Sequence, residues 1–174
     1  CSAPSTADWD GAGWGLNRSS NGRGDHPQNG LQWQQAKDIC AWTAGGGRLL
    51  SEAEWELAAN GPGAHRVYPW GDEPAPTCAN DTAIFDEAGG EAGYGCGVGG
   101  TWPLGSRPAG ASAVGALDMA GNAWEWVEDW FAGDFYDADL TTDPTGPSDG
   151  TARVMRGGGF DSKATRMRTA DRAS

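Results

Sequence analysis

The segment 121–130 combines residue types that could hold a metal ion. Trp124, Trp126 and Trp130 share one parity, so in a strand they would lie on one face. Glu125 would then point the other way, beside the backbone carbonyls of the preceding turn. A large apolar anchor on one side and a carboxylate with free carbonyls on the other suit a rigid oxygen-donor site. A tryptophan-rich core strand whose acids are merely solvated is the alternative, and the pattern alone leaves both open.

The four cysteines are the other residues with distinctive chemistry: Cys1, Cys40, Cys78 and Cys96. None forms a C-x-x-C pair and the chain has only 2 histidines, which argues against a zinc site. Cys78 and Cys96 flank a loop rich in Gly, Ala and Asp, and we expect them to form a disulfide, worth ~3 kcal/mol in the chain-entropy model. Cys1 and Cys40 would be the remaining pair. Disulfides would place the protein outside the cytosol, whereas four reduced, buried thiols are the alternative.

The composition predicts one domain with an unusual core. The chain has 174 residues, 10 Trp and 29 Gly, and few aliphatic residues. We therefore expect a core of aromatic side chains and many tight turns. A formal net charge of −12 argues against nucleic acid or an anionic membrane surface as partner. No run of 18 apolar residues is present that would predict a transmembrane segment.

A first helix is predicted over 31–43, because Trp33, Ala36, Ile39 and Cys40 recur on one face. A glycine run follows and would end it.

A second short helix is predicted after Ser51. Ser51 and Glu54 form a capping box, in which each side chain bonds the backbone of the other residue. Trp55 would lie on the buried face, and Gly61 with the following proline would end the helix.

The remaining chain reads as loops around short strands. A long loop over 73–100 needs a tether in a compact domain, by a disulfide, a metal or both. Residues 115–131 carry the tryptophan ladder, 132–150 form a second loop, and 153–156 read as a short strand.

Basic residues gather late in this acidic chain. They could line an anion-binding patch or pair with the many acids, and pairing is the favoured reading; they are Arg156, Lys163, Arg166, Arg168 and Arg172.

Four segments, in order, resemble motifs of the formylglycine-generating enzyme, or sulfatase-modifying factor, family. They are GRLLSEAEWE at 47–56, YPWG at 68–71, LDMAGNAWEW at 117–126 and RVMRGGGF at 153–160. The resemblance implies an α+β domain of low regular secondary-structure content with a C-type-lectin-like fold, two short helices, short strands and long ordered loops. It also implies that 1–174 is a single such domain lacking the usual N-terminal and extreme C-terminal strands.

The resemblance implies a copper oxidase that converts a sulfatase cysteine to formylglycine by means of two thiolates. Those two positions fall on Ser162 and Met167. A serine hydroxyl is a poor ligand for Cu(I) and a lone thioether is a weak one. No cysteine follows Cys96. We therefore expect no catalytic residues and no copper.

The family's calcium positions are better matched. One site corresponds to Asp118, Gly121, Ala123 and Glu125, with two carboxylates and two backbone carbonyls, all oxygen donors of the kind calcium requires.

A second family calcium would use Asn80, the Asp81 and Val98 carbonyls, and a carboxylate at the position of Cys96. Because Cys96 replaces that acid, a disulfide to Cys78 is expected to tether this loop in place of the metal.

Two functions follow from these expectations. The first is a non-catalytic binding or structural module, braced by calcium and located outside the cytoplasm as a secreted, periplasmic or lipid-anchored surface protein. Its partner would be an unidentified protein or small-molecule ligand. The alternative is a formylglycine-generating oxidase, which the family supports and the missing thiolates oppose.

Overall fold

The computed structural model describes residues 22–43, 45–135 and 143–174. Its helices are α1 (Trp33–Trp42), α2 (Glu52–Asn60) and the single turn α3 (Tyr94–Gly97), with two short 3₁₀ turns, η2 (Pro108–Gly110) and η4 (Ala164–Met167). Its strands are β1 (Glu125–Trp130) and β2 (Arg153–Arg156). Most of the described chain is therefore ordered loop, as the composition predicts.

Both long helices form where the sequence places them. α2 begins with the expected capping box: the Ser51 hydroxyl accepts from the Glu54 N–H, and the Glu54 carboxylate accepts from the Ser51 N–H. It ends at Gly61, whose φ of 81° is readily adopted only by glycine. α1 lies within the predicted 31–43, but none of its residues is fully buried.

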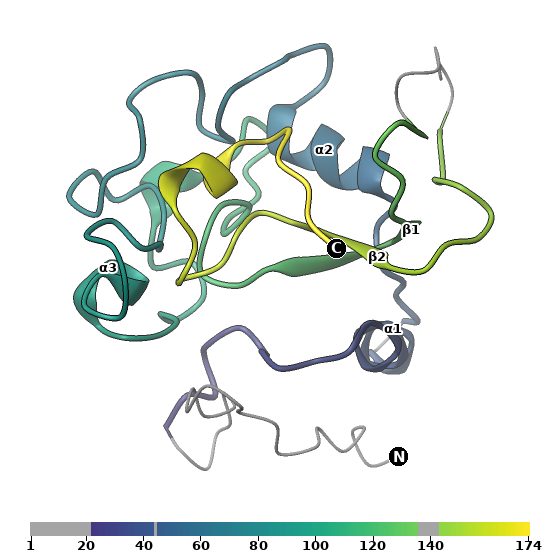
Figure 1. Cartoon of the computed structure of the whole chain (residues 1–174), viewed down its shortest axis with the longest axis horizontal. Helices are drawn as coiled ribbons and strands as arrows, with labels where there is room; N and C mark the ends of the chain where they lie inside the picture. The colour runs from purple at the N-terminus through teal and green to yellow at the C-terminus, as the bar shows by residue number, and fades with distance from the viewer. Residues whose placement is uncertain (1–21, 44, 136–142) are drawn as a thin grey trace.

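The two strands form an antiparallel pair that continues on both sides through single segments. Glu125 pairs with Arg156 and Trp130 with Arg153, with an irregularity after Trp126. On the edge of β2 that faces away from β1, the backbone of Met155 exchanges two hydrogen bonds with Ala173. The ribbon therefore lies at the centre of the molecule, with α2 on one side and α1 on the other (Figure 1).

The tryptophan ladder does not face the main core, contrary to a core-strand reading of segment 121–130. On β1 the fully buried side chains are Val127 and Asp129, at 0% and 2% exposure, whereas the three tryptophans are only partly buried. Val127 packs with Trp55 of α2 in the main core. The ladder instead faces α1 and the chain before it, where the Trp126 indole donates to the Leu31 carbonyl.

Within the segment 115–131, which carries the tryptophan ladder, only β1 is a regular strand. Residues before Glu125 form turns in which Asp118 and Asn122 have φ of 59° and 67°. These left-handed conformations are uncommon for non-glycine residues and interrupt strand geometry.

The long loop 73–100 is tethered by the predicted disulfide. Cys78 and Cys96 are bonded, with their Cα atoms 5.5 Å apart. The backbone N–H of Asp86 donates to the Ser162 carbonyl, and that of Gly95 to the Phe160 carbonyl. The loop is thereby fastened to the segment that follows β2. Cys40 forms no disulfide with another described residue, and Cys1 lies outside the described residues, so their pairing stays a prediction.

Candidate functional site

The principal cavity, about 610 Å³, lies where the segment before α1 meets the turn that leads into β1. It is lined by polar and apolar residues of 27–36 and by residues of 118–126. The segment after β2 contributes Gly159, Phe160 and Asp161. A cavity of this size suits a small-molecule ligand.

The four positions expected to bind calcium all line this cavity: Asp118, Gly121, Ala123 and Glu125. The structure therefore brings together residues that the sequence spreads over eight positions.

The turn that carries them is rigidly fixed. A Cβ at Gly121 would lie 2.3 Å from the Ile84 carbonyl oxygen, so only glycine fits this close approach. Asn122 is 2% exposed, and its side-chain amide bonds both the N–H and the carbonyl of Trp102, at 2.9 and 3.1 Å. Backbone carbonyls in such a turn keep one orientation, as a preformed cation site requires.

The two carboxylates of the turn are held by neutral donors. The Trp55 indole N–H donates to Glu125, and the Gly105 N–H donates to Asp118 at 2.7 Å. Neither acid forms an ion pair in the described part of the chain. The pKa of Glu125 is raised to about 7, chiefly by burial; the hydrogen bond from Trp55 opposes the shift and the nearby Asp118 charge adds to it. A cation between these acids would offset both unfavourable effects.

The donor set fits calcium better than a softer metal. Two carboxylates and two backbone carbonyls are hard oxygen donors. Within the described ranges no group of three or more His, Cys, Asp or Glu side chains is placed to hold a metal ion. The backbone oxygens of Gly121 and Ala123 would therefore be needed to complete a calcium shell.

The side chains of Asn80 and Asp81, at the expected second calcium position, are engaged in other contacts. The Asn80 side-chain oxygen accepts from Thr82 Oγ1 at 2.6 Å, and its amide donates to the Ala75 carbonyl. The Asp81 carboxylate pairs with Arg107 at 2.7 Å. The Val98 side chain is exposed.

Arg107 was not identified from the sequence, because no local motif links it to this loop. Its guanidinium also donates to the Cys78 carbonyl and stacks 4.5 Å from the centre of the Trp102 ring. A guanidinium and a disulfide thus brace the loop in which the resemblance implies a second metal.

The two positions at which the family carries thiolates have structural roles here. The Ser162 hydroxyl accepts a hydrogen bond from the Gly159 N–H at 3.0 Å and so closes a turn. The Met167 side chain is 1% exposed and packs with Ala83, Phe85 and Ala120 in the second core cluster. One hydroxyl and one core thioether do not fit cuprous ion, which prefers exposed, paired thiolates.

The late basic residues pair with acids, as the favoured reading predicts. Lys163 bonds Asp86 at 2.7 Å, and Arg166 and Arg168 both lie within ion-pair distance of Asp171. Three of the basic residues that follow β2 are therefore paired with acids: Lys163, Arg166 and Arg168.

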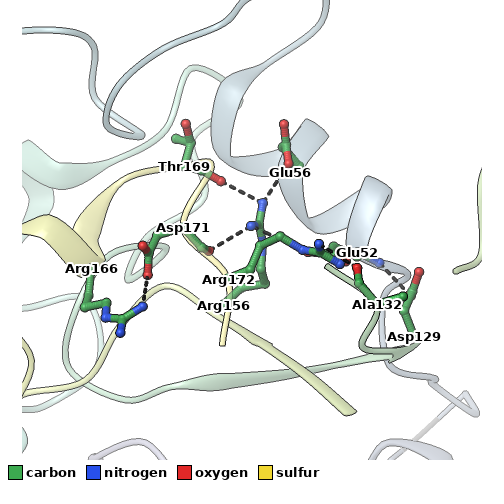
Figure 2. Close-up of polar contacts among 9 residues, drawn as sticks. All are labelled: Glu52, Glu56, Asp129, Ala132, Arg156, Arg166, Thr169, Asp171 and Arg172. Atoms are coloured by element: carbon green, nitrogen blue, oxygen red, sulfur yellow. Dashed lines mark hydrogen bonds and ion pairs between the residues drawn. The ribbon is translucent and has the colours of Figure 1, made fainter. Parts of the chain in front are cut away.

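Arg156 and Arg172 join a buried network that sequence reasoning did not identify (Figure 2). Glu52, 1% exposed, accepts two hydrogen bonds from the Arg172 guanidinium at 2.6 and 2.9 Å and lies 3.6 Å from Arg156. Arg156, fully buried, also bonds Glu56 and the Thr169 carbonyl. The network fastens the final segment to α2 and β2.

No helix in the described residues combines the length and apolar character needed to cross a bilayer.

Comparison with known proteins places this geometry in a family. The sulfatase-modifying factor enzyme 1-like domain matches residues 5–174. The chain is 40% identical to a formylglycine-generating enzyme of Streptomyces coelicolor, over 94% of the chain and 54% of that protein. It is 39% identical to the serine/threonine-protein kinase Pkn1 of Chlamydia trachomatis, over 87% of the chain and 22% of that protein.

A solved structure of the same fold supports the match. PvdO from Pseudomonas aeruginosa superposes with a TM-score of 0.65 and 26% identity, covering 86% of this chain and 56% of PvdO. The chain spans about half the length of the formylglycine-generating enzyme it matches.

Proposed function

Because this chain belongs to the sulfatase-modifying factor enzyme 1-like family, we propose that it is a non-catalytic binding module of that family, braced by calcium. The module uses the cavity beside β1 as its ligand site and the rigid turn before β1 as its metal site. The disulfide supports a location outside the cytoplasm, where such bonds persist.

One observation carries the proposal: the environment of the two positions where the resemblance implies thiolates. Met167 is a core residue, and its thioether packs against Phe85 and Ala120. Ser162 uses its hydroxyl in a local turn. Cys78 and Cys96, which pack against the same core cluster as Met167, are bonded to each other. No pair of thiolates is therefore offered to copper by the described residues.

The calcium brace is supported by the donors and by the charge. Asp118 and Glu125 repel each other unless a cation lies between them, and the turn that carries them is held by Asn122. The ion would connect the turn to β1, where the ribbon begins. Its removal should loosen the cavity wall formed by the same residues.

A formylglycine-generating oxidase is the second candidate, and the similarity to the Streptomyces formylglycine-generating enzyme favours it. The similarity to Pkn1 counterbalances this, because a similar sequence occurs there within a protein named as a serine/threonine-protein kinase. Family membership alone does not decide between oxidation and binding.

One assay separates the two functions. The protein is incubated with a Cys-x-Pro-x-Arg peptide, cuprous ion, reductant and oxygen, and the peptide is weighed by mass spectrometry. The proposal predicts an unchanged thiol peptide. Conversion of the cysteine to an aldehyde at a rate that depends on this protein would refute the non-catalytic reading. The Streptomyces enzyme serves as the positive control.

A further inference from the structure

The cavity beside β1 is lined by acids without any basic partner. Asp118, Glu125 and Asp161 contribute carboxylates, and the described residues that line the cavity include no Lys, Arg or His. None of the three forms an ion pair in the described part of the chain. By contrast, the buried acids Glu52 and Asp86 each face a basic side chain.

Calcium would neutralise only part of this charge. If the ion binds between Asp118 and Glu125, its two positive charges match those two carboxylates. Asp161, an exposed residue of the cavity lining, then remains without a cationic partner, and its side chain makes no hydrogen bond with another described residue. A ligand that carries one positive charge would complete the balance.

Aromatic side chains share the cavity lining with Asp161. Trp124, Trp126 and Phe160 line the same cavity, and the Phe160 ring is fixed edge-on against Tyr94, with ring centres 6.2 Å apart. Aromatic rings attract organic cations through their negative faces and also accept an apolar body. Carboxylate and aromatic surfaces together select an organic cation over a hydrated metal ion.

Gly159 lies beside both the Asp161 carboxylate and the Trp124 indole, and it has no side chain that could contact them. A Cβ at this position would lie 3.0 Å from Asp161 Oδ1 and 3.1 Å from Trp124 Cδ1. Any larger residue at 159 would press on both groups. The glycine therefore lets the Asp161 carboxylate and the Trp124 indole lie close together in the cavity lining.

We infer that this cavity binds a small organic cation, an ammonium or amidinium group on an apolar body, with Asp161 as its counter-ion. The inference rests on the proposed binding function and names the ligand class of that site. The cavity volume of about 610 Å³ accommodates a ligand of that class together with the calcium ion.

Phenethylammonium is a suitable probe, because it joins one positive charge to one ring. Its affinity is measured by ligand-observed NMR titration in saturating calcium, with neutral 2-phenylethanol as the uncharged control. The inference predicts that the ammonium binds at least about tenfold more tightly than the alcohol. Equal affinities would overturn it.

Two variants locate the binding. Asp161→Asn should weaken phenethylammonium binding about fivefold, the upper range for one exposed ion pair. Gly159→Ala should weaken it as well, through the space that the methyl group occupies. Asp149→Asn, which removes an exposed charge elsewhere, should leave the affinity unchanged. If Asp161→Asn binds like the parent while its melting curve is unchanged, the assignment of the counter-ion is wrong.

The same samples separate this inference from the proposed function. If a chelator leaves the melting curve unchanged, the calcium brace is refuted but the role of Asp161 is not. Aldehyde formation in the peptide assay would refute the non-catalytic function. The ammonium titration would still test the role of Asp161 independently. Loss of charge selectivity in the titration, with calcium binding intact, would remove only the inference.

Discussion

The buried carboxylate of Glu52 offers the sharpest test of how this loop-rich fold is held together. It lies at the start of α2 and accepts two hydrogen bonds from the Arg172 guanidinium, with Arg156 3.6 Å away (Figure 2). Replacing Glu52 by glutamine keeps the size of the side chain and removes its charge. Two arginines with little or no exposure to water then lose their shared counter-ion.

The expected cost is about 3 kcal/mol of unfolding free energy. Breaking one partner of a buried pair costs roughly 3–5 kcal/mol, because the other charge stays buried and unpaired. The low end applies because Arg156 keeps Glu56, 2.7 Å away. For a chain of this size, the melting temperature should fall by about 6–12 °C.

Glu54→Gln is the matched control on the same helix. Glu54 pairs with Arg48 at 2.6 Å, but both side chains are largely exposed. Glutamine at this position can still bond the Ser51 N–H, so the capping box remains. We expect a loss under ~1 kcal/mol. Urea unfolding followed by tryptophan fluorescence measures both variants, and equal losses would refute the reasoning about the buried network.

Three further predictions concern the cross-links of the fold. With free calcium at roughly 100 times its Kd, a chelator should lower the melting temperature by about 5–10 °C, and Glu125→Ala should abolish that response; identical melting curves would contradict the brace. Replacing both Cys78 and Cys96 by serine should cost ~3 kcal/mol in urea unfolding, and non-reducing peptide mapping of the parent should recover the two cysteines in one linked fragment. Lys163, chiefly through its hydrogen bond, lowers the pKa of Asp86, so the pair stabilises the fold above the ordinary aspartate pKa and loses its effect as the pH falls below it. Lys163→Met should therefore reduce the urea midpoint at about pH 6 and leave it nearly unchanged at about pH 2, whereas a pH-independent loss would exclude this linkage.

The parts of the fold that local chemistry determines could be predicted from the sequence. The capping box of Ser51 and Glu54 determines the start of α2, and Gly61 determines its end. The disulfide follows from two cysteines at the ends of a loop that needed a tether. These features depend on residues close in the chain or on a reactive pair, so neighbouring sequence contains the necessary information.

The face of the tryptophan ladder could not be predicted in the same way. Alternation shows that Trp124, Trp126 and Trp130 share a side, but not which layer covers that side. The answer depends on α1 and the chain before it, which pack there and leave Val127 to the main core. Burial of a tryptophan under a thin outer layer gives the same sequence pattern as burial in the centre.

The residues of the candidate site also divide into those that could be predicted from the sequence and those that could not. Spacing and resemblance together identified Asp118 and Glu125, and the structure places both on one cavity. Asp161 was missed because it follows the family motif and belongs to no pattern of its own. Arg107 was missed because its partners, Asp81 and the Cys78 carbonyl, are more than 25 residues away.

The residues at the positions where the resemblance implies thiolates show how this segment supports the fold without them. A thiolate needs an open, polar surrounding, whereas Met167 is enclosed by Phe85, Ala83 and Ala120 and contributes to the core instead. Ser162 likewise stabilises the turn that Gly159 opens. Returning a cysteine to position 167 would remove core volume at a cost of about 1–3 kcal/mol before any metal could bind. The same turn leaves room for Asp161 beside Trp124. The segment where the resemblance implies oxidising groups thus supplies core packing through Met167 and a cavity carboxylate through Asp161, which supports the proposed binding of a cation.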